Sequence, residues 1–118
     1  MKRILVIEDN PMVVHALDFK LTKVGYEIVT AEDGRKAKQL IETQAFDLII
    51  TDLMLPFING SELIEFIKEL HPNLPIMVLS TANQEETITN IFELGVEDYI
   101  TKPFSPNELI LRVKRILH

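Results

Sequence analysis

Short apolar runs alternate along the whole chain with segments in which apolar residues recur every three or four positions. The run Leu48-Ile49-Ile50 is too short for a helix but apolar throughout, which is typical of a strand covered on both faces in a parallel sheet. Together with four other strand-like segments, of which the second is weaker, this run predicts strands at residues 3–8, 26–30, 48–50, 75–80 and 97–101.

The segments between these runs carry apolar stripes at helical spacing and predict five helices. Asn10 and Pro11 supply a cap and a first-turn proline for the first helix, and Gly25 stops it. Ser105 and Glu108 predict a capping box for the last helix. The helices are expected at residues 11–24, 34–44, 63–70, 85–94 and 106–116, and the fourth is expected to bury Ile88, Ile91 and Phe92.

Strict alternation of strands and helices predicts an α/β fold, a doubly wound parallel sheet with right-handed crossovers and helices on both faces. With 118 residues, the chain is expected to be one domain spanning 1–118. Because the strands are parallel, their carboxyl ends share one rim, where open α/β sheets place their ligand sites.

Charge and composition narrow the classes of function. A formal net charge of -6 opposes the phosphate field of DNA, so this domain alone is not expected to bind nucleic acid. The absence of cysteine excludes disulfides and thiolate metal sites. The apolar run Ile4 to Ile7 is too short for a signal-peptide core or a membrane span, so we expect a cytoplasmic protein with no membrane partner.

Three carboxylates and one lysine fall at the predicted strand ends. Glu8 and Asp9 follow the first strand, Asp52 follows the third and Lys102 follows the fifth. Like charges about 4 Å apart repel by roughly 4 kcal/mol at an effective dielectric of 20, so three carboxylates in one crevice call for a cation. Magnesium prefers oxygen ligands and keeps waters, which predicts Asp9 and Asp52 as direct ligands with Glu8 behind a water.

In order and spacing, Glu8-Asp9, Asp52-Leu-Met-Leu-Pro56, Ser80 and Lys102-Pro103-Phe104 resemble the receiver domain of two-component response regulators. The resemblance spans essentially the whole chain. It implies a five-stranded sheet of flavodoxin-like order 2-1-3-4-5, counted along the chain. It also implies a signalling protein that catalyses only its own aspartyl phosphorylation and dephosphorylation, with a histidine kinase or phosphotransfer protein as partner.

The same resemblance implies roles for individual residues. Asp52 accepts the phosphoryl group, and Lys102 binds the phosphoryl oxygens. Magnesium is held by Asp9, Asp52 and the backbone carbonyl of Met54. In physical terms, an ionised carboxylate attacks phosphorus, and the transfer needs positioning and charge neutralisation, which magnesium and the Lys102 ammonium supply.

A switch and an output surface also follow from the resemblance. Ser80 is the switch hydroxyl and Tyr99 the switch aromatic, which turns inward once Asp52 is phosphorylated and so alters the surface of the fourth helix, fifth strand and fifth helix. There, Asp98, Glu108 and Arg112 resemble the charged residues through which related receivers form symmetric dimers. The alternative is an ion pair within one chain, worth under about 1 kcal/mol.

Some positions depart from the family pattern. Thr81 follows Ser80 at a position where a smaller residue is usual. Thr81 is the second candidate, after Ser80, for the switch hydroxyl. Pro56 and Gly60 prevent the strand from continuing or a helix from starting directly after Asp52, so a loop is expected there. In this loop Phe57-Ile58 replaces the small residue usual after the proline and predicts an apolar patch beside Asp52.

Other functions compete with phosphoacceptance. A phosphotransferase with an aspartyl-phosphate intermediate would carry a second acid where Met54 stands, and a nucleotide binder would not place Glu8 and Asp9 in its first loop. A pseudo-receiver that binds proteins without being phosphorylated is the remaining alternative.

Overall fold

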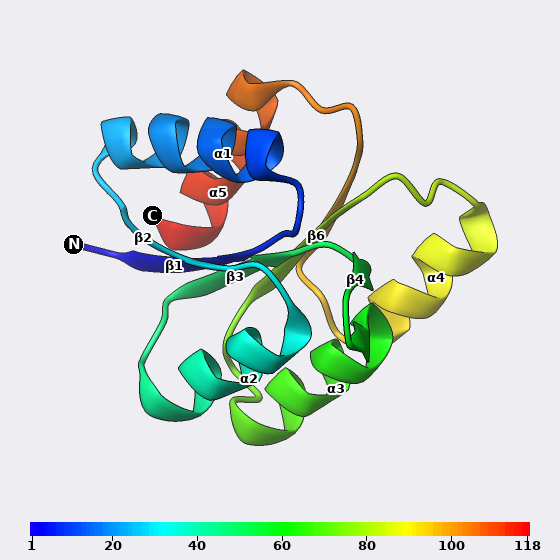
Figure 1. The fold of residues 1–118 in the computed structure, drawn as a ribbon. Helices are drawn as coiled ribbons and strands as arrows, with labels where there is room; N and C mark the ends of the chain where they lie inside the picture. The colour runs from blue at the N-terminus through cyan, green and yellow to red at the C-terminus, as the bar shows by residue number, and fades with distance from the viewer.

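A five-stranded parallel sheet forms the centre of this computed structural model, which describes residues 1–118 (Figure 1). The sheet has the order β2-β1-β3-β6-β7, which is 2-1-3-4-5 when these five strands are counted along the chain and confirms the predicted fold. Its strands are β1 (Arg3–Ile7), β2 (Glu27–Ala31), β3 (Leu48–Thr51), β6 (Ile76–Ser80) and β7 (Asp98–Thr101).

Helices cover both faces of the sheet (Figure 1). One face carries α1 (Pro11–Val24) and α5 (Pro106–Leu117). The other carries α2 (Gly34–Thr43), α3 (Gly60–Leu70) and α4 (Glu85–Glu93). Two apolar clusters of 14 and 12 buried residues fill these two layers, because alternate residues of each strand point to opposite faces. The inner strands β1, β3 and β6 are therefore buried along almost their whole length, whereas the edge strand β2 is only partly buried.

The helix ends follow the local chemistry of the sequence. The Asn10 side chain accepts a hydrogen bond from the Met12 N–H at 2.9 Å, and Gly25 ends α1 with a φ of 116°. At the start of α5, the Ser105 hydroxyl accepts from the Glu108 N–H at 3.4 Å. The Glu108 carboxylate pairs with Arg112 instead of reaching back, so half of the predicted capping box is present.

Two local predictions were wrong. The segment after Asp52 was expected to be a loop, but it forms a two-stranded antiparallel hairpin, β4 (Met54–Leu55) and β5 (Ile58–Asn59), before α3 begins. Phe92 was expected to be buried and is 43% exposed. Ile91 is the only buried residue of α4, and Ile88 is partly buried against the same core.

Candidate functional site

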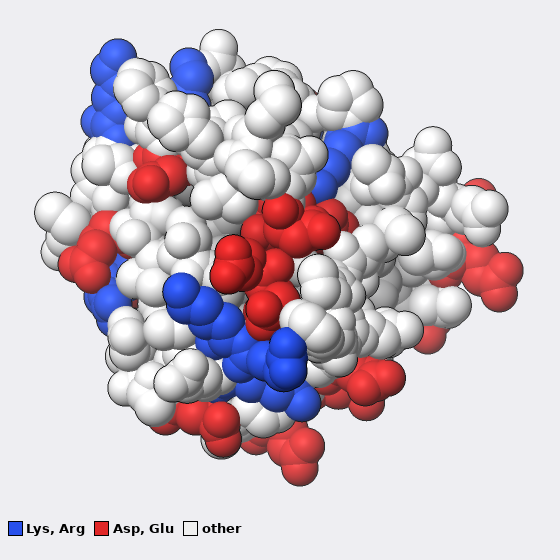
Figure 2. Space-filling view, viewed as in Figure 1, with Lys and Arg blue, Asp and Glu red and all other residues white.

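The carboxyl ends of β1, β3 and β7 bring the predicted charged residues together. Glu8, Asp52 and Lys102 each follow directly after one of these strands, and Asp9 follows Glu8. Carboxylate oxygens of Glu8, Asp9 and Asp52 all lie within 4.8 Å of one another. Figure 2 shows acidic side chains gathered on this face of the molecule, with basic side chains beside them.

Lys102 joins two of the three carboxylates. Its Nζ donates to Glu8 Oε1 at 2.5 Å and to Asp52 Oδ2 at 2.9 Å, and its side chain is 13% exposed. Burial alone would lower the pKa of Lys102, but the hydrogen bonds to Asp52 and Glu8 outweigh burial and raise it. Lys102 is therefore a fixed cation at the centre of the site.

Glu8 is the most buried carboxylate of the cluster, with 2% of the residue exposed. Burial raises the pKa of Glu8, although its hydrogen bonds to Lys102 and to the Asn10 N–H oppose this, and the charge of Asp52 raises it further. Asp9 is exposed to solvent. The site thus contains three carboxylates and one lysine, so it has fewer positive than negative groups.

The Asp52 carboxylate is held at both oxygens. Oδ1 accepts from the N–H groups of Leu53 at 2.6 Å and Met54 at 3.2 Å, and Oδ2 accepts from Lys102. The Asp52 N–H donates to the Ile7 carbonyl at 3.1 Å, which ties the backbone to β1. These bonds fix the orientation of the carboxylate.

The donor set fits a hard divalent cation. Three carboxylates within reach of one another are the ligands that magnesium prefers, and the acidic cluster lacks the positive charge that such an ion would bring. Met54 lies two residues after Asp52 and directs its N–H toward the Asp52 carboxylate. The roles of Glu8, Asp9 and the Met54 carbonyl as metal ligands remain predictions.

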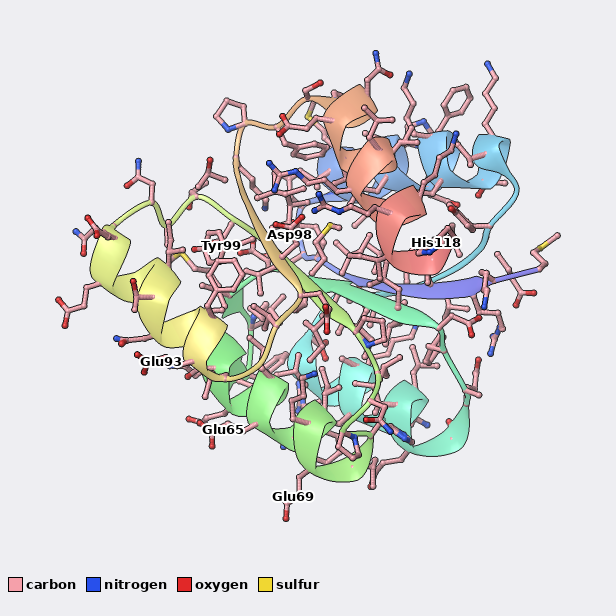
Figure 3. All side chains as sticks on the ribbon, turned by 180° about the vertical axis from the view of Figure 1, so that it is seen from behind. Glu65, Glu69, Glu93, Asp98, Tyr99 and His118 are labelled. Carbon is pink, nitrogen blue, oxygen red and sulfur yellow. The ribbon has the colours of Figure 1, made fainter.

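The two predicted switch residues converge on Ala82. The Ser80 hydroxyl accepts from the Ala82 N–H at 3.1 Å, while the Tyr99 hydroxyl donates to the Ala82 carbonyl at 2.7 Å. Ser80 is fully buried at the end of β6, whereas Thr81, the reserve candidate, is exposed. Tyr99 lies on the α4 side of β7 with its hydroxyl already bonded inward, so the expected inward turn does not start from an outward ring (Figure 3). Burial raises the pKa of its phenol.

Of the predicted interface residues, Asp98 lies on the side of β7 opposite to Tyr99 and faces α5 (Figure 3). Glu108 and Arg112 lie on α5 itself. Arg112 donates to Asp98 at 2.9 Å and to Glu108 at 2.6 Å, and the hydrogen bond to Glu108 is the main cause of its raised pKa. Asp98 is 8% exposed, and its second oxygen lies 3.6 Å from Arg115. Within one chain these residues form ion pairs with each other, the alternative that the sequence leaves open.

The β4–β5 hairpin beside Asp52 is a part of the site that the sequence pattern does not predict. Pro56 occupies the first position of its two-residue turn and Phe57 the second, with a φ of +73°. A turn with proline first and positive φ second has the pattern of type II, where glycine is usual. Pro56 was the available signal, but a phenylalanine at the second position concealed it.

Comparison with known proteins agrees with this geometry. The family model described as "Response regulator receiver domain" matches residues 4–114. The alkaline phosphatase synthesis transcriptional regulatory protein PhoP of Bacillus subtilis is 40% identical over 98% of this chain and 48% of its own length. The phosphate regulon transcriptional regulatory protein PhoB of Pseudomonas aeruginosa is 38% identical over 98% of this chain and 52% of its own.

Among solved structures, the non-phosphorylated HemR receiver domain of Leptospira biflexa superposes with a TM-score of 0.94 at 32% identity, covering 99% of this chain and 94% of that one. The chain spans about half the length of the curated relatives it matches, at 48% and 52%. None of its helices has the length and apolar character needed to cross a membrane.

Proposed function

We propose that this chain, which belongs to the response regulator receiver domain family, accepts a phosphoryl group on Asp52 from a histidine kinase or a phosphotransfer protein. Proteins of this family are signalling proteins rather than enzymes with a separate substrate. The observation that carries the proposal is the Asp52 carboxylate, which backbone N–H groups orient on one side and the buried Lys102 ammonium on the other.

In the proposed transfer, a carboxylate oxygen of Asp52 forms a bond to phosphorus while the bond from phosphorus to the donor's imidazole nitrogen breaks. The donor leaves with the electron pair of that bond. The Lys102 ammonium, which lies 2.9 Å from Asp52, stabilises the negative charge of the phosphoryl oxygens. Leu53 and Met54 hold the attacking group in place through their N–H groups.

Magnesium is the proposed cofactor of this transfer. Asp9 and Asp52 would hold the ion directly with the Met54 carbonyl, and Glu8 would act through a water. When bound, the ion would neutralise charge on the phosphoryl oxygens. The ion would also stabilise Glu8, because burial raises the pKa of Glu8 and a nearby cation favours the ionised form of a buried carboxylate.

The proposal is tested by the intact mass of the protein after incubation with magnesium and acetyl phosphate, a small phosphodonor. We expect wild type to gain the mass of one phosphoryl group, and Asp52→Ala to gain none. Asp47→Ala is a matched control, because Asp47 lies at the opposite end of β3 and its carboxylate accepts from the Arg3 N–H at 2.8 Å. A wild type that gains no mass would favour the pseudo-receiver alternative.

For the output, we propose that phosphorylation acts through Ser80. A phosphoryl group on Asp52 gives the Ser80 hydroxyl a charged acceptor, and any movement of Ser80 pulls on the Ala82 N–H that it binds. Because the Ala82 carbonyl is held by Tyr99, the movement is passed to β7 and to the α4 surface. The phosphoryl group thereby biases two pre-existing states rather than creating a new one.

Symmetric dimerisation through Asp98, Glu108 and Arg112 is the second part of the proposed output. The three residues pair within one chain, so a dimer would exchange these pairs for equivalent ones between protomers. Sedimentation velocity with a beryllofluoride mimic of the phosphoryl group tests this on wild type and Arg112→Glu. A mimic-bound wild type that stays monomeric at high concentration would reject the dimer and leave this surface to another protein.

A further inference from the structure

Phe57 adopts a backbone conformation that large side chains rarely take. Its φ of +73° lies in the left-handed region, and no other residue except glycine has a positive φ in this structure. Its side chain is not buried in the core, because the residue is 67% exposed. Strained residues of this kind persist only when their surroundings hold them, and they concentrate at functional sites.

Arg35, in the first turn of α2, supplies one of the contacts that hold Phe57. Its guanidinium lies 3.6 Å from the centroid of the Phe57 ring, the shortest of the four cation–π contacts in the molecule. The neighbouring Gly34 donates its N–H to the Pro56 carbonyl at 3.3 Å. A Cβ at Gly34 would overlap the Ile58 side chain, so the start of α2 lies directly against the hairpin turn.

The base of the hairpin contacts the candidate phosphoacceptor. Met54 pairs with Asn59 in the hairpin, and the Gly60 N–H donates to the Leu53 carbonyl at 3.0 Å. Leu53 and Met54 are the residues whose N–H groups orient the Asp52 carboxylate. A continuous set of contacts therefore runs from the start of α2, through the hairpin, to Asp52.

We propose that Arg35 and Phe57 form a latch, meaning the stacked pair of these two side chains, that fixes the β4–β5 hairpin and so positions the Asp52 carboxylate for metal binding and phosphoryl transfer. This inference rests on the proposed function. Arg35 and Phe57 are positioning residues, because they act through the hairpin and not on the phosphoryl group. The latch is a property of this chain's own residues, since the turn geometry alone would be satisfied by glycine.

Loss of the latch is expected to loosen the hairpin without unfolding the domain, because both side chains are exposed. An exposed cation–π pair corresponds to about a two- to fivefold change in an equilibrium constant. For Arg35→Ala and Phe57→Leu we expect amide hydrogen exchange at Leu53 and Met54 to rise by about that factor. Magnesium affinity by calorimetry and the rate of phosphorylation by acetyl phosphate should fall by about the same factor.

Lys38→Ala is the matched control. Lys38 lies on the same helix and stacks over Phe66 at 5.0 Å, so its removal deletes an equal charge and a similar contact that does not involve the hairpin. Lys38→Ala should leave all three readouts at their wild-type values. Phe57→Tyr keeps an aromatic face for Arg35, so it should also leave the three readouts at their wild-type values. The contrast with Phe57→Leu distinguishes an aromatic role of Phe57 from a merely apolar one.

The outcomes separate the latch from the proposed function. If wild type takes no phosphoryl group, the proposed function fails, while hydrogen exchange and magnesium affinity still test the latch. If wild type is phosphorylated but Arg35→Ala and Phe57→Leu match it in all three readouts, the latch is rejected. Equal losses in Lys38→Ala would also reject it, because the effect would then belong to surface charge and not to the stack on Phe57.

Discussion

Replacing Lys102 with methionine removes the only cation that contacts Glu8 and Asp52 while keeping a side chain of similar length. The lost ammonium lies 2.5 Å from Glu8 and 2.9 Å from Asp52, and those two side chains are 2% and 9% exposed. Breaking a buried ion pair by removing one partner costs about 3–5 kcal/mol, because the other charge stays buried without compensation. We expect a loss of that size in the metal-free domain at neutral pH, a large share of the roughly 5–15 kcal/mol that stabilises an ordinary domain.

This loss should depend on pH in a defined direction. The raised pKa of Lys102 keeps it charged in wild type below its ordinary value of 10.5, so Lys102 itself does not titrate between pH 4 and 7. Burial already raises the pKa of Glu8, and without Lys102 it rises further. A carboxyl whose folded pKa is raised contributes most stability when protonated and loses it as pH rises through that pKa. The deficit of Lys102→Met should therefore shrink as pH falls from neutral toward 4.5, the ordinary pKa of Glu8.

Urea unfolding followed by circular dichroism, in buffer with a metal chelator, measures the deficit at each pH. Lys114→Met is the matched control, because Lys114 is an exposed lysine on α5 away from the site, and it should change the unfolding free energy little. Adding Glu8→Gln to Lys102→Met should recover part of the loss, since it removes one of the uncompensated charges. A Lys102→Met domain as stable as wild type at neutral pH, or a deficit that grows in acid, would refute this view of the site.

Three further predictions follow from the same geometry. Asp9→Ala should weaken magnesium binding by calorimetry and yet leave the metal-free domain at least as stable as wild type in urea, because it removes a repelling carboxylate. Arg112→Ala should destabilise the domain by about 1–3 kcal/mol in urea, because Asp98 would remain buried with Arg115 at 3.6 Å as its only cation. Tyr99→Phe should lose less stability than wild type as the pH rises above 10. Burial raises the pKa of Tyr99, so the contribution of this phenol to stability is present below pH 10.0 and is lost as the phenol ionises at higher pH. Alkaline unfolding of both proteins measures the difference, and parallel curves would contradict it.

Much of the molecule is predictable from the sequence because the inner strands β1, β3 and β6 are buried on both faces. Such strands are mostly apolar, as in the run Leu48-Ile49-Ile50 of β3, and the helices between them carry apolar stripes and caps. Once the strands are known to be parallel, their ends must share a rim. That is enough to bring Glu8, Asp52 and Lys102 together from positions 94 and 50 residues apart in the chain.

The features that the sequence does not predict are those for which the local pattern of apolar and polar residues carries no information. Strands of two residues have no period, and Phe57 stands at a turn position where glycine is expected, so the hairpin after Asp52 is invisible in the sequence. Phe92 falls on the apolar stripe of α4, but only tertiary packing decides that its ring meets Tyr99 at the surface, 6.4 Å away, instead of entering the core. The partners of Arg112 likewise depend on packing and not on spacing alone.

The central claim is that Asp52 is the sole phosphoryl acceptor. Treatment of the acetyl phosphate-labelled domain with borohydride, which reduces an aspartyl phosphate and so marks its position, followed by peptide mass spectrometry, tests this directly. We expect the mark on Asp52 and on no other residue of wild type, and no mark in Asp52→Ala. A mark on Asp9 or Glu8 in wild type, or full labelling of Asp52→Ala, would contradict it.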